Sequence, residues 1–186
     1  MGRFTITELP LPGLMRVERQ RVGDSRGFLA RLFCADELAA AGWSGPVAQI
    51  NHTQTTRQGT VRGLHFQHAP YAETKLVSCL RGRVWDVVVD LREGSPTFGR
   101  WHAEELSAEN GSALLIPQGF AHGFQTLCDG AELLYCHSAA HAPQAEGAVH
   151  PHDERLAIGW PLSITELSAR DAGQPRLAAK FKGLPA

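Results

Sequence analysis

Apolar and polar positions alternate in short runs along most of this chain. Residues 15–20 alternate apolar with mainly charged side chains, which is typical of a strand that is buried on one face. From residue 46 onward, short runs rich in β-branched and aromatic residues follow one another closely. We expect further strands at residues 28–33, 47–52, 60–66, 75–80, 83–91, 99–106, 113–116, 121–127 and 132–138.

Turn-forming residues separate these runs. The turns are residues 23–27, Arg81-Gly82, Gly94-Ser95-Pro96, Glu109-Asn110-Gly111, Pro117-Gln118-Gly119 and Cys128-Asp129-Gly130. Short strands joined by turns, with no helices between them, favour an antiparallel sheet fold over an α/β fold. We therefore predict an all-β protein whose strands form a jelly-roll, an antiparallel β-sandwich.

The two ends of the chain are less regular. Residues 1–13 contain Pro10 and Pro12 and predict an arm with at most a short edge strand. Residues 35–41 predict a short helix that ends at Gly42, and residues 167–171 predict a helical turn. No repeat, linker or low-complexity segment divides the sequence. We therefore expect residues 1–186 to form a single domain with a C-terminal appendage.

Composition limits the classes of function. The chain is 43% hydrophobic and 20% charged, which is ordinary for a soluble globular protein. A formal net charge of −1 gives no basic field for nucleic acid or a membrane surface, and no apolar run is long enough to span a bilayer. The four cysteines are far apart without a CxxC pair, which favours reduced thiols over a disulfide or zinc framework. We expect a cytoplasmic protein with no nucleic-acid or membrane partner.

The strand predicted at residues 60–66 contains a histidine among apolar neighbours. Side chains alternate between the two faces of a strand, so Gly63, His65 and Gln67 should share one face. Arg62 and Leu64 should then lie on the opposite face. A strand glycine is common where a ligand or another backbone comes close. Taken alone, His65 is equally well explained as a core histidine that makes one hydrogen bond.

Three more polar residues lie in runs that otherwise look buried, namely Lys75, His122 and Tyr135. Each alone has an ordinary explanation: an edge-strand charge, a turn residue and a packed ring with a surface hydroxyl. Burial of unpartnered polar groups is costly, so four of them on separate strands, with His65, predict a polar cavity inside the sandwich. The histidines that we interpret as loop or surface residues without a role are His52, His68, His137, His150 and His152.

An ordered set of motifs runs through about residues 14–175. They are Asp24-x-Arg26-Gly27-Phe28, Gln49-x-Asn51, Val61-Arg62-Gly63-Leu64-His65-Phe66-Gln67, Lys75-Leu76-Val77, Asp86-Val87-Val88-Val89-Asp90-Leu91-Arg92, Gly94-Ser95-Pro96-Thr97-Phe98-Gly99, Ile116-Pro117-x-Gly119-Phe120-Ala121-His122-Gly123-Phe124, Tyr135, Trp160-Pro161 and Ser168-x-Arg170-Asp171. In this set the sequence resembles the dTDP-4-dehydrorhamnose 3,5-epimerase family. The resemblance implies a cupin-type jelly roll with few helices, a homodimer without metal or cofactor, and a nucleotide-linked 4-keto-6-deoxyhexose substrate.

The resemblance also implies a role for each catalytic position. Epimerisation next to a ketone requires a base, an acid on the opposite face of the sugar and a group that stabilises the enolate. His65 matches the family's base, and Asp171 matches the carboxylate that orients it. Lys75 matches the cation near the enolate, and Tyr135 matches the opposite-face acid. These residues leave open whether C3, C5 or both centres are inverted.

Other matched positions imply contacts with the substrate. Arg26 and Arg62 are candidates for the diphosphate, because a guanidinium group suits phosphate oxygens. We expect Arg26 to come from the partner subunit of the dimer. The remaining positions matched to substrate binding are Phe28, Gln49, Asn51, His122, His141 and Arg170.

Three positions depart from the family pattern. Arg31 stands where the family usually has a carboxylate, and His141 stands where it usually has a tyrosine. Both positions belong, by resemblance, to the nucleotide side of the site, so we expect intact chemistry with an altered tolerance for the nucleobase. Glu73 replaces the glutamine that commonly lies two residues before the catalytic lysine.

Two other interpretations remain open from the sequence. A metal-dependent cupin enzyme would use His65, Glu73 and His122 as ligands for iron or manganese. Metal cupins, however, typically carry His-x-His on one strand, and Gln67 occupies the second of these positions. A non-catalytic sugar-binding cupin would retain the pocket without turnover, but the joint presence of base, orienting carboxylate, cation and acid favours an enzyme.

Overall fold

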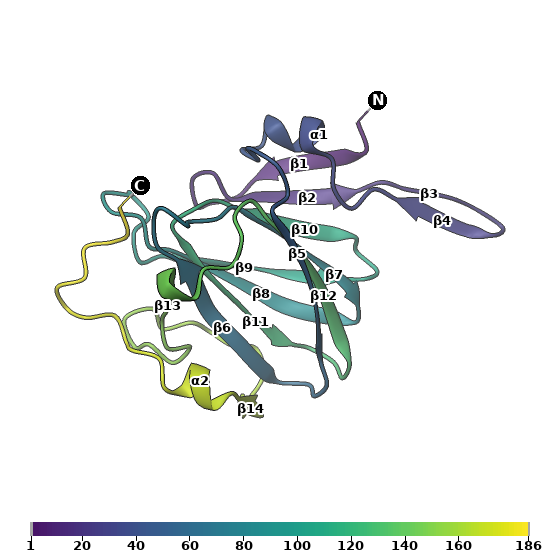
Figure 1. The fold of residues 1–186 in the computed structure, drawn as a ribbon. Coiled ribbons are helices and arrows are strands. Elements are labelled where there is room, and N and C mark those ends of the chain that lie inside the picture. Colours follow the sequence, from purple (N-terminus) through teal and green to yellow (C-terminus); the bar gives the residue numbers. More distant parts are fainter. Residues whose placement is uncertain (1, 186) are drawn as a thin grey trace.

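The strands form two large sheets that pack face to face, as the predicted all-β jelly-roll sandwich requires (Figure 1). The computed structural model describes residues 2–185. The strands are β1 (Phe4–Glu8), β2 (Met15–Arg19), β3 (Arg21–Asp24), β4 (Gly27–Ala30), β5 (Gln49–Thr55), β6 (Thr60–Gln67), β7 (Lys75–Arg81), β8 (Arg83–Asp90), β9 (Trp101–Ser107), β10 (Ser112–Ile116), β11 (Phe120–Thr126), β12 (Ala131–His137), β13 (Glu146–Ala148) and β14 (Glu166–Leu167). One sheet has the order β1-β2-β10-β7-β12-β5, and the other has the order β13-β6-β11-β8-β9 with β14 beside β6.

Three short helices accompany the sheets: α1 (Ala35–Ala39), the 3-10 helix η1 (Pro143–Ala145) and α2 (Ala169–Ala172). The predicted helices at residues 35–41 and 167–171 are therefore confirmed with slightly different ends. Ser168 caps α2, because its hydroxyl accepts a hydrogen bond from the backbone N–H of Asp171 at 3.0 Å. None of the helices formed by residues 2–185 has the length and apolar character needed to cross a bilayer.

The central core lies between the two sheets. It contains inward-facing side chains of both, including Val77, Leu133, Val88 and Phe124. Each such side chain contributes about 1.5–3 kcal/mol by leaving water. The outer faces are also covered: Leu38 and neighbouring residues pack on the first sheet, and the C-terminal segment packs on the second. Cover on both faces explains why several strands look continuously apolar instead of alternating.

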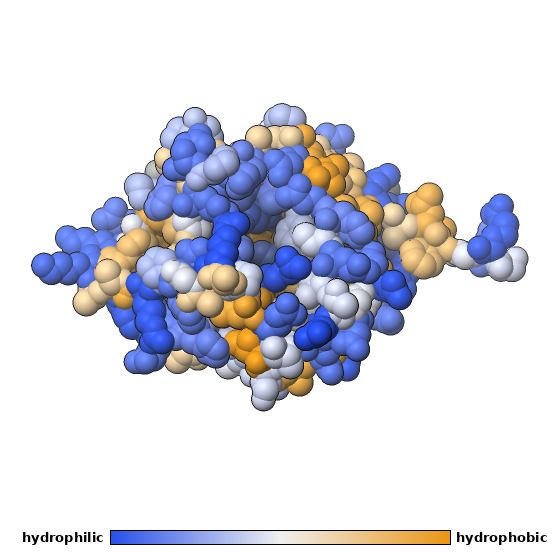
Figure 2. Space-filling view, turned by 60° about the horizontal axis from the view of Figure 1, so that its bottom comes forward, coloured by the Kyte–Doolittle hydropathy of each residue, from blue (hydrophilic) through white to orange (hydrophobic). Residues whose placement is uncertain are grey.

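A two-stranded arm, formed by β3 and β4, leaves the body of the protein (Figure 1). The predicted turn at residues 23–27 is shorter in the structure, and the strand predicted at 28–33 begins at Gly27 and ends at Ala30. Phe28 and Leu29 are 61% and 67% exposed. Figure 2 shows this arm at the right, with hydrophobic side chains along it and hydrophilic ones at its tip. None of the residues of β3 and β4 is buried by the rest of residues 2–185.

Candidate active site

A polar cavity of about 350 Å³ lies between the two sheets. Strands β5, β7 and β12 of one sheet and β6 and β11 of the other line it, together with the segment after β12 and the start of α2. The cavity contains the four polar strand residues that the sequence singled out, His65, Lys75, His122 and Tyr135. The prediction that they converge on the interior of the sandwich is therefore confirmed.

His65 is held by a carboxylate from the C-terminal helix. Its Nε2 lies 2.7 Å from Oδ1 of Asp171, which is 3% exposed. Burial disfavours the charged carboxylate, but the hydrogen bond and charge of His65 and the backbone N–H of Gly63 outweigh this and lower the pKa of Asp171. An ionised carboxylate therefore fixes the imidazole while the ring remains open to the cavity.

The predicted alternation of β6 is wrong at Arg62. Arg62 lines the cavity together with His65, although the two residues are three positions apart. The β6–β11 pairing shifts register between His122 and Phe124, which breaks the period of two. Gly63 lies at this irregularity with a φ of +133°, and a Cβ there would be 2.5 Å from Cα of Gly123. The glycine therefore permits a close backbone approach, as the sequence suggested.

His122 has a buried carboxylate partner on the neighbouring strand β8. Its Nε2 lies 2.9 Å from both oxygens of Asp86, which is fully buried. Burial raises the pKa of Asp86 against the opposing effects of His122 and the Lys75 charge. Burial, followed by the Asp86 charge, also raises the pKa of Tyr135. The Tyr135 phenol therefore keeps its proton at neutral pH and is available as a donor.

Lys75 belongs to a buried ion-pair cluster and not to an exposed sheet edge. Its strand β7 lies between β10 and β12, and its Nζ is 3.0 Å from Oε1 of Glu73. The other Glu73 oxygen is 2.9 Å from Nδ1 of His137. Our interpretation of His137 as a loop or surface residue is wrong: it ends strand β12, is 8% exposed and stacks against Tyr135.

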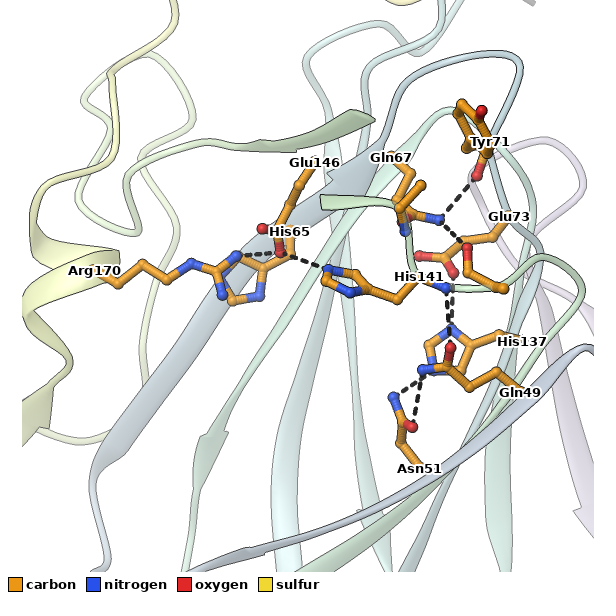
Figure 3. A network of polar contacts seen from close by, with 12 residues as sticks. Gln49, Asn51, His65, Gln67, Tyr71, Glu73, His137, His141, Glu146 and Arg170 are labelled. Atoms are coloured by element: carbon orange, nitrogen blue, oxygen red, sulfur yellow. Dashed lines mark hydrogen bonds and ion pairs between the residues drawn. The ribbon is translucent and has the colours of Figure 1, made fainter. Parts of the chain in front are cut away.

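The rim of the cavity carries the other predicted substrate contacts. Figure 3 shows Arg170, Glu146 and His141 in a row, with Glu146 paired to Arg170 and 3.7 Å from His141. Gln49 donates a hydrogen bond to Asn51 and accepts one from the backbone N–H of His141. Asn51, His141 and Arg170 line the cavity, and Gln49 is hydrogen-bonded to the first two.

Arg26 and Phe28 lie outside this cavity. Both are on the β3–β4 arm, where the Arg26 side chain is 87% exposed and, among residues 2–185, forms its ion pair with Asp24 of the same arm. This is the placement expected of residues that serve a partner subunit. Arg31, just beyond β4, forms an ion pair with Glu37 of α1.

The sequence interpretation missed three residues of this site. His137 lies two residues after Tyr135, and strand alternation alone would have placed both on one face. Asp86 is an acidic residue inside an apolar run, which signals a buried partnership. Glu146 follows a proline-containing segment without periodicity, and nothing in the sequence indicates that it reaches Arg170. Among residues 2–185, no group of three His, Cys, Asp or Glu side chains is arranged to hold a metal ion.

Sequence comparison with known proteins identifies the same family that the motifs resemble. The family model described as dTDP-4-dehydrorhamnose 3,5-epimerase matches residues 8–179. The dTDP-4-dehydrorhamnose 3,5-epimerase of Pseudomonas aeruginosa is 43% identical over 180 residues, covering 96% of this chain and 98% of the relative.

Solved structures agree with this match. The 3,5-epimerase of Legionella pneumophila, in complex with dTDP-4-keto-L-rhamnose, superposes with a TM-score of 0.90 at 37% identity over 98% of this chain and 97% of the other. A 3'-monoepimerase from Streptomyces bikiniensis, in complex with dTDP-quinovose, gives a TM-score of 0.87 at 38% identity, over 95% and 91% of the two chains. The matches favour neither the metal-dependent nor the non-catalytic interpretation. The chain belongs to the dTDP-4-dehydrorhamnose 3,5-epimerase family.

Proposed function

We propose that this protein is an isomerase that epimerises a dTDP-linked 4-keto-6-deoxyhexose in the biosynthesis of rhamnose-type sugars. The observation that carries the proposal is the grouping of His65, held by Asp171, with Lys75 and Tyr135 around one cavity between the sheets. This is the set of groups that inversion next to a ketone requires. The relatives named above act on the same class of substrate.

In the proposed mechanism, His65 removes the proton from the carbon next to the C4 ketone. Asp171 orients the ring and stabilises the imidazolium that forms, since it is ionised and at hydrogen-bond distance. The electron pair of the broken C–H bond moves to the ketone oxygen, where the Lys75 ammonium stabilises the enolate. Tyr135 then gives its proton to the opposite face of the same carbon and becomes a phenolate.

The remaining matched residues bind the substrate in this proposal. Arg62, at the cavity, and Arg26, from the arm of the partner subunit, hold the diphosphate. Contacts with the sugar and nucleotide come from Phe28 of that arm and from Gln49, Asn51, His122, His141 and Arg170. The protein works as a homodimer in the cytoplasm, with residues 1–186 as one catalytic domain, and needs no metal or cofactor. The exposed apolar arm and the four free cysteines support the dimer and the reducing compartment, respectively.

Nuclear magnetic resonance in heavy water tests the function. The wild-type protein should exchange ring protons of the dTDP-4-keto-6-deoxyhexose for deuterium and form an epimer, and the positions exchanged identify C3, C5 or both. Tyr135→Phe should still exchange a proton through His65 but form no epimer, because only the opposite-face acid is lost. A wild-type protein that binds the sugar nucleotide without exchange would be a non-catalytic binder.

The dimer and the nucleobase have separate tests. Arg26→Ala should weaken substrate binding, and mixing it with an Arg62→Ala variant should restore some sites, because a hybrid dimer combines one intact arm with one intact cavity. Absence of such complementation in a proven mixed dimer would remove Arg26 from the shared site. For the base, we expect dTDP, UDP, CDP and GDP sugars to react at more similar rates than a strict dTDP enzyme allows, because Arg31 and His141 replace the usual residues.

A further inference from the structure

Ala140, His141 and Ala142 follow strand β12 at the rim of the cavity and belong to no helix or strand. Each of the three nevertheless has a backbone group bonded to a glutamine side chain. The Gln67 amide donates to the carbonyl oxygen of Ala140 at 3.3 Å, and the Gln67 oxygen accepts from the N–H of Ala142 at 2.6 Å. Between them, the N–H of His141 donates to Gln49 at 2.9 Å. Gln67 lies on β6 and Gln49 on β5, so both sheets hold this segment.

The Gln67 side chain also reaches a second loop. Gln67 is 5% exposed, and its amide donates a third hydrogen bond to the carbonyl oxygen of Tyr71 at 2.9 Å. Figure 3 shows Gln67 pointing toward Tyr71. Tyr71 lies in the loop between β6 and β7 that carries Glu73, the ion-pair partner of Lys75. Gln67 therefore joins the loop before β7 to the segment after β12, and both border the cavity.

The backbone at His141 is fixed, while the His141 side chain stays open to a ligand. This side chain is 50% exposed, and its Nε2 lies 3.7 Å from Glu146. Buried backbone groups need partners, and side-chain amides supply them where no sheet ladder runs. A binding group on a loop gains affinity when its backbone is ordered in advance, because ordering during binding costs free energy. The two glutamines provide this order.

We propose that Gln67 is a positioning residue for nucleotide binding, because its hydrogen bonds to Ala140 and Ala142 set where the His141 side chain meets the nucleotide. This inference rests on the proposed function, in which His141 contacts the substrate. The proposed proton-transfer residues, His65 and Tyr135, belong to strands and do not depend on this segment for their positions. Loss of the Gln67 contacts should therefore weaken nucleotide binding and leave kcat nearly unchanged.

The chain offers a matched control, a second buried glutamine with the same set of contacts. Gln125 on β11 is 0% exposed, and its oxygen accepts from the N–H of Leu162 at 3.0 Å. Its amide donates to the carbonyl oxygens of Leu162 at 2.9 Å and of Gly59 at 3.3 Å. Neither Gln125 nor Leu162 lines the cavity formed by residues 2–185. A substitution at Gln125 therefore removes the same kinds of hydrogen bond without touching the site.

Methionine variants of the full-length protein separate positioning from stability. Methionine is close to glutamine in shape but makes none of these hydrogen bonds, so Gln67→Met and Gln125→Met should lower the Tm by comparable amounts. Calorimetric titration with dTDP should give a Kd about 3- to 10-fold higher for Gln67→Met and unchanged for Gln125→Met, because only the first loses an ordered binding segment. Inorganic pyrophosphate, which lacks the nucleoside, should bind both variants as it binds the wild type.

Turnover gives a second readout. In Gln67→Met, KM for the dTDP-4-keto-6-deoxyhexose should rise with little change in kcat, as expected when binding is lost equally from substrate and transition state. Gln67→Glu keeps the acceptor for the Ala142 N–H and loses the amide donors, so its Kd for dTDP should lie between those of wild type and Gln67→Met. If Gln67→Met does not fold, Gln67→Glu is compared with Gln125→Glu in the same titrations.

The outcomes separate the inference from the proposed function. An active wild type whose Gln67→Met variant binds dTDP equally well overturns the inference alone. So do equal losses of dTDP affinity in Gln67→Met and Gln125→Met, or equal losses for dTDP and pyrophosphate in Gln67→Met, because each would reflect a general weakening of the protein or the site. A folded wild type that exchanges no ring proton of the sugar nucleotide overturns the proposed function, and this readout is independent of the titrations.

Discussion

Two histidine–carboxylate pairs of the cavity have similar lengths but opposite electrostatics. His65 lies 2.7 Å from Asp171, and His122 lies 2.9 Å from Asp86. Burial opposes ionisation of Asp171, but the hydrogen bond and charge of His65 and the backbone N–H of Gly63 outweigh it and lower the pKa, whereas complete burial dominates at Asp86 and raises the pKa. The surroundings of the carboxylate, and not its distance from the ring, decide whether its pKa is lowered or raised.

The difference extends to the histidines. The His65 side chain is 32% exposed, toward the cavity, while that of His122 is 6% exposed. A base must reach its substrate and exchange its proton with solvent between turnovers, which favours His65. His122 is enclosed, and its pair with Asp86 supports the wall next to Tyr135. The exposed pair is therefore suited to the proton transfer that we propose, and the enclosed pair is suited to holding the cavity wall.

The largest expected effect is on activity, at the exposed pair. His65→Ala should lower kcat/KM for epimerisation by about 10²–10⁴-fold and should abolish solvent exchange in parallel, because it removes the proposed base. The fold should survive, since the ring is partly exposed. Progress curves of epimer formation measure the rate, and His52→Ala is a matched control on exposed strand β5. A His65→Ala protein that keeps most of its activity would assign the base elsewhere and remove the contrast between the pairs.

The next effect is on stability, at the enclosed pair. Asp86→Ala leaves His122 without its buried partner, which should reduce the free energy of unfolding by about 3–5 kcal/mol. Asp171→Ala should cost only about 1–3 kcal/mol, because His65 faces the cavity and water can replace the lost partner. Urea denaturation followed by circular dichroism measures both. Equal losses would mean that the two pairs contribute alike to the fold.

Much of the fold followed from the sequence because turn residues marked the strand ends. The strands from β5 to β12 lie at or near their predicted positions. The strands β13 and β14 were missed because they are three and two residues long, too short for a periodicity to appear. The β3–β4 arm was read as a turn and a longer strand, since its length depends on exposed pairing and not on a hydrophobic pattern.

The site residues that could be predicted from the sequence are polar residues within otherwise apolar strands. His65, Lys75, His122 and Tyr135 are polar residues in apolar runs, and the structure brings all four to one cavity. The carboxylate partners of these residues were not predictable in the same way. Asp86 and His122 are 36 positions apart and meet only through the β8–β11 pairing. The register shift that puts Arg62 on the cavity side depends on the contact between Gly63 and Gly123, which no local pattern encodes.

The smallest effect, and the most specific to the comparison, is the pH dependence of stability. The folded pKa of Asp171 is below its unfolded value of about 3.9. Its stabilisation is therefore present above that value and is lost as the pH falls through the folded pKa. The folded pKa of Asp86 is above its unfolded value, so the folded state gains stability as the pH falls toward the ordinary carboxyl range.

The two asparagine variants should therefore move in opposite directions. On acidification below about pH 4, the ordinary carboxyl pKa, the Tm advantage of wild type over Asp171→Asn should shrink as the pH falls through the folded pKa of Asp171. On acidification from about pH 7 toward about pH 4, the Tm of wild type relative to Asp86→Asn should rise, because only the wild type can take up the stabilising proton. Differential scanning calorimetry at matched ionic strength measures both differences. Two differences of the same sign would show that the carboxylates sit in equivalent environments, and that exposure of the histidine alone separates the pairs.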